Sequence, residues 1–288
     1  MEIRHYHPQA RILADSRNQE TNDRLVSFEI ANFPKVLLQE LNTHRLLSRN
    51  AASSRAMPVA KVIERVKTEP YIPTFRENQR GMVGKVLVDQ ERADKAVHIY
   101  KTALDRAIEQ AEQLGALQIH KEAVNRLLEP FMTVPVIVSG TEWQNFFNLR
   151  TSPNATPDFQ AVALLLEKLY RSNRPQVLSH GEMHLVYSDY IPDHLSLIDR
   201  LKVMSARCAR ISYTNHGSNV MDIEKDLQLA ENLLQDGHLS PLEHLAWAIG
   251  KREGLGINTR NYQGFLSFRA YWEITGLLDQ LCPKTTEI

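Results

Sequence analysis

Residues 42–55 read NTHRLLSRNAASSR, and the amphipathic stretch PKVLLQEL precedes them at residues 34–41. The apolar residues of that stretch fall at helical spacing, which predicts a helix that runs into residues 42–55. Guanidinium groups bind phosphate through paired hydrogen bonds, and Ser or Thr hydroxyls can satisfy its remaining oxygens. The segment therefore favours an anion-binding site; the alternative is a solvated helix end, where the helix dipole favours cations. The cationic and imidazole side chains concerned are His44, Arg45, Arg49 and Arg55.

The bulk composition is that of a globular protein. A chain of 288 residues can bury about 75% of its unfolded surface, enough for one large domain. Its 34 basic and 34 acidic residues cancel, which argues against a general nucleic-acid or membrane-surface binder. Cys208 and Cys282 are the only cysteines, so a disulfide framework is excluded and a reducing cytosol is expected. Because membrane-span and signal-peptide patterns are lacking, we expect a soluble, cytoplasmic protein.

The hydrophobic pattern predicts helices and strands without a regular alternation of the two. Residues 56–90 and 171–200 look irregular, and residues 206–213 could end a helix or form a strand. Because no βαβ repeat and no clear linker is present, we predict a single α+β domain over residues 1–288. Strands are expected over 25–30, 134–138 and 245–249, and helices over 89–114 (ended by Gly115), 117–128 (stopping at Pro130), 142–150, 158–170 (with Asp158 near its N-cap) and 220–234 (closed by Gly237).

Two segments in the middle of the chain add candidate arginines. Residues 143–150 read WQNFFNLR, and inward packing of the aromatic residues and Leu149 would place Arg150 at the edge of a pocket. The alternative is a surface Arg at a helix C-terminus. Arg126 lies on an amphipathic pattern four residues before Pro130, and by itself it reads as a solvated helical Arg.

Residues 238–244, HLSPLEH, form the last candidate segment and follow SARCARISY at 205–213. A zinc site is not expected there, because Pro241 breaks the helical register and no further ligand set is near in sequence. A capped helix start, with Ser240 as N-cap and Glu243 three residues on, is the structural alternative. His180 and His184 read as loop or core histidines, and Cys208 reads as a packed core cysteine.

These segments together resemble the signature of the flavin-dependent thymidylate synthases. That signature has an Arg-His-Arg triplet, seven residues, a Ser, and an Arg two positions further on. Residues 43–55 reproduce the spacing, with Thr43 in place of the first Arg and Ala51 in place of the signature's Glu. Residues 145–150 are similar to the family's Asn-Phe-x-x-Leu-Arg segment, and Arg126 stands at the family's distance from a Pro. The segments at 205–213 and 238–244 are similar to Ala-Arg-Val-Ser-Tyr/Phe and His-x-Ser/Thr-Pro-x-Glu-His.

The order of these segments differs from the family pattern. In the family the two segments that resemble residues 205–213 and 238–244 come first, and here they come last. The resemblance therefore implies a circular permutation, which a core tolerates when the chain ends lie at the surface.

The resemblance implies helices around a central, mostly antiparallel sheet, in a homotetrameric enzyme. The enzyme would use FAD, NADPH and methylenetetrahydrofolate to convert dUMP to dTMP. Arg150 would be catalytic, because it would stabilise negative charge on the uracil ring, and no metal would be needed. The resemblance assigns FAD to His44, Arg45, Asn145 and Ser240, and the nucleotide to Glu40, Thr43, Ser53, Ser54, Arg55, Arg126 and Arg150.

The two departures, Thr43 and Ala51, leave alternatives open. Arg49 could supply one of the missing contacts. Within the enzyme class, water could capture the one-carbon unit and give a hydroxymethyl product from dUMP or dCMP. In another class, the chain would be a non-catalytic protein that binds a nucleotide or flavin.

Overall fold

The computed structural model describes residues 6–211, 222–250 and 259–275. A five-stranded sheet with the order β3-β4-β2-β1-β5 forms its centre, and a three-stranded sheet, β6-β7-β8, lies beside it. Within these ranges, no helix combines the length and the apolar character that crossing a membrane requires. The elements are β1 Ala10–Asn18, β2 Arg24–Pro34, η1 Lys35–Leu37, α1 Leu38–Asn42, β3 Ser48–Ala51, η2 Ser54–Ala56, α2 Val59–Thr68, α3 Gln90–Ala116, α4 Lys121–Val124, η3 Asn125–Leu127, η4 Glu129–Phe131, β4 Thr133–Gly140, α5 Trp143–Arg150, α6 Pro157–Ser172, β5 Gln176–Leu178, β6 Met183–His184, α7 Leu197–Arg210, α8 Ile223–Gln235, η5 Ser240–His244, β7 Ala246–Ala248, β8 Phe265–Ser267 and α9 Phe268–Ile274.

The central sheet is mostly antiparallel, so the predicted α+β class is confirmed. β2 pairs antiparallel with β1 and β4, and β3 pairs antiparallel with β4. Only the short β5 joins in parallel, along the outer side of β1. The β-branched run at 134–138 lies inside β4, which explains why it reads clearly as a buried strand.

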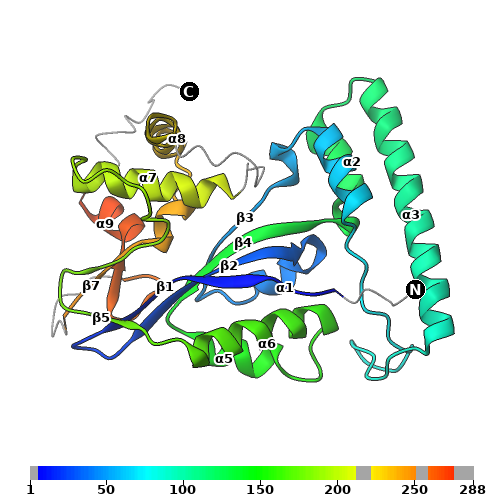
Figure 1. Cartoon of the computed structure of the whole chain (residues 1–288), viewed down its shortest axis with the longest axis horizontal. Helices are drawn as coiled ribbons and strands as arrows, with labels where there is room; N and C mark the ends of the chain where they lie inside the picture. The colour runs from blue at the N-terminus through cyan, green and yellow to red at the C-terminus, as the bar shows by residue number, and fades with distance from the viewer. Residues whose placement is uncertain (1–5, 212–221, 251–258, 276–288) are drawn as a thin grey trace.

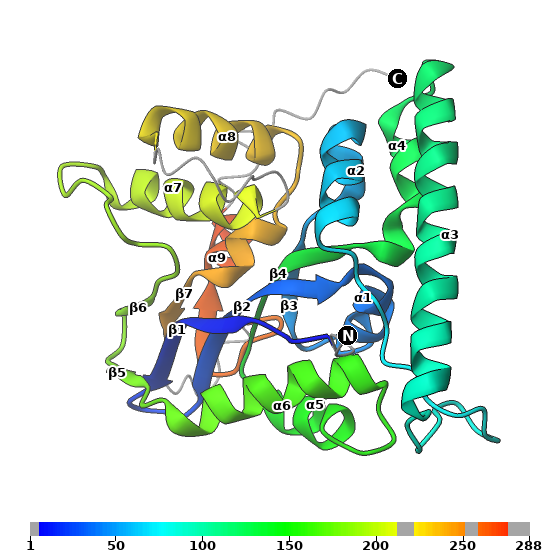
Figure 2. The ribbon, with the colours of Figure 1, turned by 45° about the vertical axis from the view of Figure 1, so that its right-hand side comes forward.

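Helices cover both faces of the central sheet (Figure 1, Figure 2). On one face, Phe28 and Phe33 of β2 meet the aromatic side chains of α5 and α6 in the largest apolar cluster. On the other face, Ile137 of β4 joins a second cluster that includes side chains of α7, α8 and α9. The alternation of side chains along β2 and β4 thus separates two cores. The long α3 packs beside α2, away from the central sheet (Figure 2).

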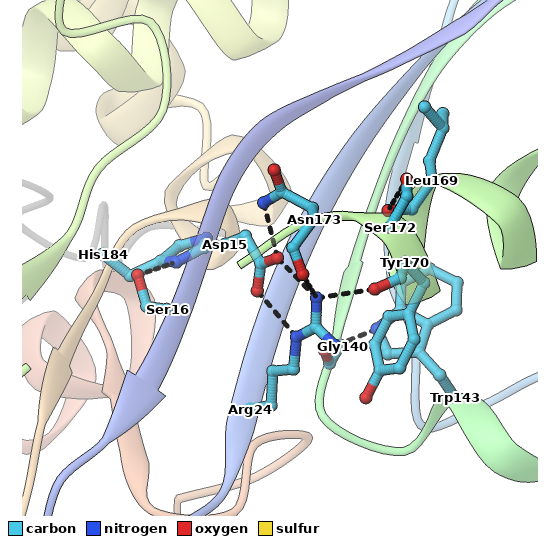
Figure 3. Close-up of polar contacts among 10 residues, drawn as sticks. All are labelled: Asp15, Ser16, Arg24, Gly140, Trp143, Leu169, Tyr170, Ser172, Asn173 and His184. Carbon is cyan, nitrogen blue, oxygen red and sulfur yellow. Dashed lines mark hydrogen bonds and ion pairs between the residues drawn. The ribbon is translucent and has the colours of Figure 1, made fainter. Parts of the chain in front are cut away.

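A buried ion pair fastens α6 to the β1–β2 hairpin (Figure 3). The Arg24 guanidinium donates from Nε and Nη2 to the two carboxylate oxygens of Asp15, at 2.8 and 2.6 Å. It also donates to the carbonyl oxygen of Tyr170 at 2.7 Å, and its Cζ lies 3.9 Å from the centre of that ring. Asn173 donates to the same carboxylate at 2.7 Å. Arg24 therefore holds the C-terminal end of α6 against the sheet.

Several predicted boundaries are wrong. Residues 34–41 form two short helical turns, and part of the following segment is the strand β3. Residues 59–68, expected to be irregular, form α2 after Pro58, with Val62, Ile63 and Val66 buried at helical spacing. The predicted helix at 117–128 is reduced to α4 and the single turn η3, within which the Asn125 side chain donates to the carbonyls of Ser54 and Met57.

The C-terminal half agrees better with the predictions. Residues 206–211 end a helix, Gly237 follows α8 with a positive φ of +71°, and β7 lies within the predicted strand. Residues 171–200, expected to be irregular, contain the short strands β5 and β6. Thr156 is the N-cap residue of α6 but makes no side-chain hydrogen bond to the helix, and the buried Asp158 accepts hydrogen bonds from Tyr71 and Thr74. Tyr213 and residues 220–221 lie outside the described residues.

Candidate active site

Arg150, at the end of α5, is held by α1 and the residues that follow it. Its Nη1 donates to Glu40 Oε2 at 2.8 Å, and its Nη2 donates to the Glu40 carbonyl at 3.0 Å and to Thr43 Oγ1 at 3.1 Å. Its Nε donates to His44 Nε2 at 2.9 Å. The Phe159 ring lies against the guanidinium, with its centre 4.7 Å from Cζ. The structure thus brings together four of the predicted site residues.

The aromatic residues of α5 place Arg150 there. Trp143, Phe146 and Phe147 are buried, as predicted, and Trp143 donates to the carbonyl of Gly140 at 2.7 Å. Leu149 was expected to pack inward as well, but it is 53% exposed. In a helix only one stripe can face the core, and the aromatic residues occupy it.

His44 is buried between two arginines. Its pKa is lowered to about 4, because burial disfavours the charged ring and because Arg150 and Arg49 lie nearby. Arg49 donates to the carbonyls of His44 and Leu47, at 2.6 and 2.8 Å, and so closes the turn between α1 and β3. His44 is therefore neutral at pH 7.

A second group of cations lies at the far end of β3. Arg55 of η2 and Arg126 of η3 are exposed, and neither has an ion-pair partner among the residues that the structure describes. Burial is the main cause that lowers the pKa of Lys35. The nearby Glu129 raises this pKa, and the guanidinium groups of Arg126 and Arg55 lower it. Lys35 donates to the carbonyl of Ala52 at 3.0 Å. We call Arg55, Arg126 and Lys35 the basic cluster; together with Glu129 it carries a net positive charge.

Two serines border the basic cluster. The Ser54 hydroxyl donates to Glu129 at 2.5 Å, so it is already engaged within the protein. Ser53 is half-buried and begins η2. The Asn125 side chain, which the sequence did not single out, donates to the carbonyls of Ser54 and Met57 at 2.7 and 2.9 Å. Asn125 thereby fixes η2 against η3 and sets where Arg55 and Arg126 stand.

The other residues assigned to FAD are exposed. Arg45, Asn145 and Ser240 have no side-chain hydrogen bond to any part of the chain that the structure describes. Ser240 is not the N-cap of a capping box: η5 begins after Leu239, and no side chain caps it. Instead, Glu243 forms an ion pair with Arg269 of α9.

The segment 238–244 packs against the strand that carries the opening motif. η5 contacts β3, β4 and α7. Burial lowers the pKa of Arg49, and the nearby carboxylate of Glu243 partly opposes this shift. Asn261 donates to Ser48 of β3 at 3.2 Å. The segments that stand last in the chain therefore meet the ones near its start.

A row of serines crosses the sheet where the two parts meet. Ser48, Ser139 and Ser27 are register partners on β3, β4 and β2. Ser139 Oγ lies 2.5 Å from Ser27 Oγ and 2.8 Å from His244 Nδ1. His184 Nε2 lies 2.9 Å from Ser27 Oγ. Its Nδ1 lies 2.8 Å from Ser16 Oγ (Figure 3). Burial lowers the pKa of both histidines to about 3, so this serine row binds two neutral rings.

The sequence predicts loop or core histidines at positions 180 and 184, and His184 is a buried core histidine; the serines carry no such prediction. A signal was present, because Ser27 interrupts an apolar run and Ser139 ends one. His180 lies in an exposed loop, where its Nδ1 accepts from the Gly250 amide at 2.8 Å. Cys208 is buried as predicted, and burial raises the pKa of its thiol.

Comparison with known protein families assigns the class of this protein. Residues 21–176 match the family described as thymidylate synthase complementing protein, a match that defines an enzyme of the flavin-dependent thymidylate synthase-like methyltransferase class. Because the match covers more than half of the 288 residues, the chain belongs to this family. The resemblance drawn from the motifs is therefore confirmed. No curated protein matches the chain.

Two similar solved structures are crystal structures of a UMP/dUMP methylase, PolB, from Streptomyces cacaoi. The one bound with 5-Br UMP is 14% identical, with a TM-score of 0.45, and the match covers 57% of this chain and 88% of that chain. The one bound with 5-Br dUMP is 13% identical, with a TM-score of 0.46, and the match covers 58% and 91%. The family assignment rests on the match over residues 21–176.

Proposed function

We propose that this protein transfers a one-carbon unit from methylenetetrahydrofolate to C5 of dUMP and gives dTMP, with FAD as cofactor and NADPH as reductant. The observation that carries the proposal is that the part of the chain that matches the family contains two groups of donors, namely the basic cluster, and Arg150 with its partners Glu40, Thr43 and His44. A nucleotide monophosphate needs cations for its phosphate and a directed donor for its base, and these two groups offer both.

The phosphate would bind at the basic cluster. Arg55 and Arg126 are exposed and free of partners in the described residues, so their guanidinium groups can meet phosphate oxygens bidentately. Ser53 could add a hydroxyl donor. Ser54, whose hydroxyl already donates to Glu129, would contribute by holding η2 rather than by touching the nucleotide.

The base would lie against Arg150. A fixed guanidinium stabilises negative charge that develops on the uracil ring, which is an electrostatic role and not a proton transfer. Glu40 and Thr43 would contribute through their hydrogen bonds to Arg150.

FAD fits the donors that remain. Arg45, Asn145 and Ser240 have polar atoms without partners among the described residues, and the Nδ1 atom of His44 faces no hydrogen-bond acceptor there. Cations and amide donors of this kind suit the phosphates and ring oxygens of a flavin nucleotide. When bound, the flavin supplies the redox and one-carbon chemistry, while the chain supplies position and charge.

We also propose that residues 1–288 form one domain whose motif order is circularly permuted. The contacts of η5 with β3 and β4 support this, because they join the last motifs to the first ones in space. A homotetramer in a reducing cytoplasm is part of the same proposal, and the buried free thiol of Cys208 suits that compartment.

Release of tritium from C5-labelled dUMP, with FAD, NADPH and methylenetetrahydrofolate, tests the activity. We expect release together with dTMP, identified by mass spectrometry. Parallel reactions with dCMP and UMP identify the base, and a product heavier by one oxygen would indicate hydroxymethylation instead. Absence of release from all three nucleotides would refute the proposal and leave a nucleotide- or flavin-binding role.

A further inference from the structure

Nearly all donors of the Arg150 guanidinium are committed within the protein. Of its five N–H groups, the one on Nε goes to His44 and both on Nη2 go to Glu40 and Thr43. One of the two on Nη1 goes to the Glu40 carboxylate. The remaining Nη1 N–H has no partner among the described residues. The side chain is only 16% exposed, so Arg150 offers one direction and not an open fork.

His44 supplies the contact that fixes the inner edge of the guanidinium. Because Nε2 accepts a hydrogen bond from Arg150 Nε, which has no lone pair to offer in return, the ring proton must sit on Nδ1. The Phe146 ring meets the imidazole edge-on, with the centres 5.0 Å apart, and so restricts its rotation. His44 is 7% exposed.

The outer edge of the Arg150 guanidinium is fixed by Glu40, and Glu40 is itself held by two threonine hydroxyls. Its second carboxylate oxygen accepts from Thr156 Oγ1 at 2.9 Å, and its carbonyl accepts from Thr43 Oγ1 at 2.7 Å. The charged groups around His44 are thus Arg150 on α5, Arg49 on β3 and, through Arg150, Glu40 on α1. A hydrogen bond between a neutral ring and a guanidinium paired with a carboxylate requires no buried uncompensated charge.

We propose that His44 is a positioning residue that, in its Nδ1–H tautomer, holds Arg150 so that the single free Nη1 N–H is presented to a carbonyl oxygen of the pyrimidine ring. The proposal rests on the proposed function in one respect, namely that Arg150 acts on the base. It distinguishes His44, which acts through Arg150, from the cations of the basic cluster, which would bind the phosphate directly.

Two substitutions at this position separate its two ring nitrogens. His44→Gln can place an amide oxygen near the former Nε2, where it can accept from Arg150. His44→Asn places its amide near the former Nδ1 and leaves Arg150 Nε without an acceptor. A lost hydrogen bond to a charged group corresponds to about a ten- to hundredfold change. His44→Gln also removes the Nδ1 donor proposed for FAD, so both variants are assayed at saturating FAD. Under that condition we expect kcat for tritium release to fall by about that factor in His44→Asn and by less than about threefold in His44→Gln.

The KM for dUMP is expected to stay within about threefold in both variants, because the phosphate contacts lie elsewhere. A merely structural role would affect the two variants alike and would lower their melting temperatures together. Equal losses of kcat in His44→Gln and His44→Asn would overturn the proposal, as would a raised KM with an unchanged kcat.

An independent measurement separates the failure of this proposal from failure of the proposed function. The ¹⁵N ring resonances of His44 in the ¹⁵N-histidine-labelled protein, assigned with His44→Gln, report which nitrogen carries the proton. We expect Nδ1 to be protonated at pH 7, and the Nε2 resonance to shift in Arg150→Ala. A protonated Nε2, or no shift in Arg150→Ala, overturns the positioning role. An inactive wild-type protein with the expected tautomer would instead refute only the activity.

Discussion

Replacing Ser139 by Ala tests the serine row that joins the two halves of the chain. Ser139 Oγ is fully buried and contacts both Ser27 Oγ, at 2.5 Å, and His244 Nδ1, at 2.8 Å. The Nε2 atom of His244 has no partner among the described residues, so the substitution would leave that ring without any hydrogen bond. A buried polar group left unsatisfied costs about 1–3 kcal/mol. With Ser27 and His244 both affected, the free energy of unfolding should fall by about 2–5 kcal/mol.

Thermal unfolding followed by circular dichroism measures this change. At about 2–4 °C for each kcal/mol in a chain of this size, the melting temperature should drop by roughly 4 to 20 °C. Ser172→Ala is the matched control, because that hydroxyl is exposed and makes only a 3.3 Å contact with the Leu169 carbonyl (Figure 3). A drop no larger in Ser139→Ala than in Ser172→Ala would refute the reasoning. The double variant with Ser27→Ala should lose less than the sum of the single variants, because the two hydroxyls share one interaction.

Three further outcomes concern the basic cluster, the Arg24 ion pair and His44. Arg126→Ala should raise the KM for dUMP about ten- to hundredfold in steady-state kinetics. Arg174 is an exposed arginine outside the basic cluster, so Arg174→Ala should leave this KM unchanged. Equal effects of the two substitutions would contradict the phosphate assignment. Arg24→Met should lower the free energy of unfolding by about 3–5 kcal/mol, because it leaves the Asp15 carboxylate buried without its partner, and adding Asp15→Asn should restore part of the loss in urea unfolding. The pKa of His44 is lowered to about 4 in the folded state from an ordinary value near 6.5, so the unfolded chain takes up the proton first and stability is lost as the pH falls from about 6.5 to 4. His44→Gln should weaken this pH dependence, and equal slopes of melting temperature against pH in the wild-type protein and the variant would exclude the effect.

The sequence predicts best where one local rule decides the structure. Asp89 caps α3 by accepting from the Arg92 amide at 2.9 Å, and the apolar period of that helix is unbroken, so its start is placed within one residue. The strand β4 is similarly clear, since β-branched residues buried on both faces form a continuous run.

The strand β1 could not be found in this way, because its buried residues are polar. Asp15, Ser16 and Asn18 are all less than 9% exposed, and each depends on a partner distant in sequence. Asp15 binds Arg24, Ser16 binds His184, and Asn18 donates to the carbonyls of Ile249 and Gly264. Such residues look like a surface loop until the partners are known. The pairing of Ser139 with His244 has the same character, as the two residues are 105 positions apart.

The candidate site was predicted in part for the same reason. Arg55, Arg126 and Arg150 follow from short motifs. The contacts around Arg55 and Arg126 come from Asn125 and Glu129, which the sequence does not mark, and Glu40, which the resemblance assigns to the nucleotide, instead binds Arg150. Hydrogen bonds between segments set these orientations, and no spacing within one segment encodes them.

The departure at Thr43 has a physical explanation in the same contacts. Thr43 Oγ1 accepts from Arg150 Nη2 at 3.1 Å and donates to the Glu40 carbonyl at 2.7 Å. Because the Thr43 hydroxyl is short and neutral, the Arg150 guanidinium has room to reach both the Glu40 carboxylate and the Glu40 carbonyl. A second arginine at position 43 would place a like charge beside Arg150 and would compete for the same carboxylate, at a cost of several kcal/mol if both were desolvated. Glu40 and Thr43 therefore form a consistent pair: the carboxylate balances Arg150, and the hydroxyl completes its coordination. Within this chain, the residue that replaces the signature's first arginine is the one that lets Arg150 be held by Glu40 and His44 together.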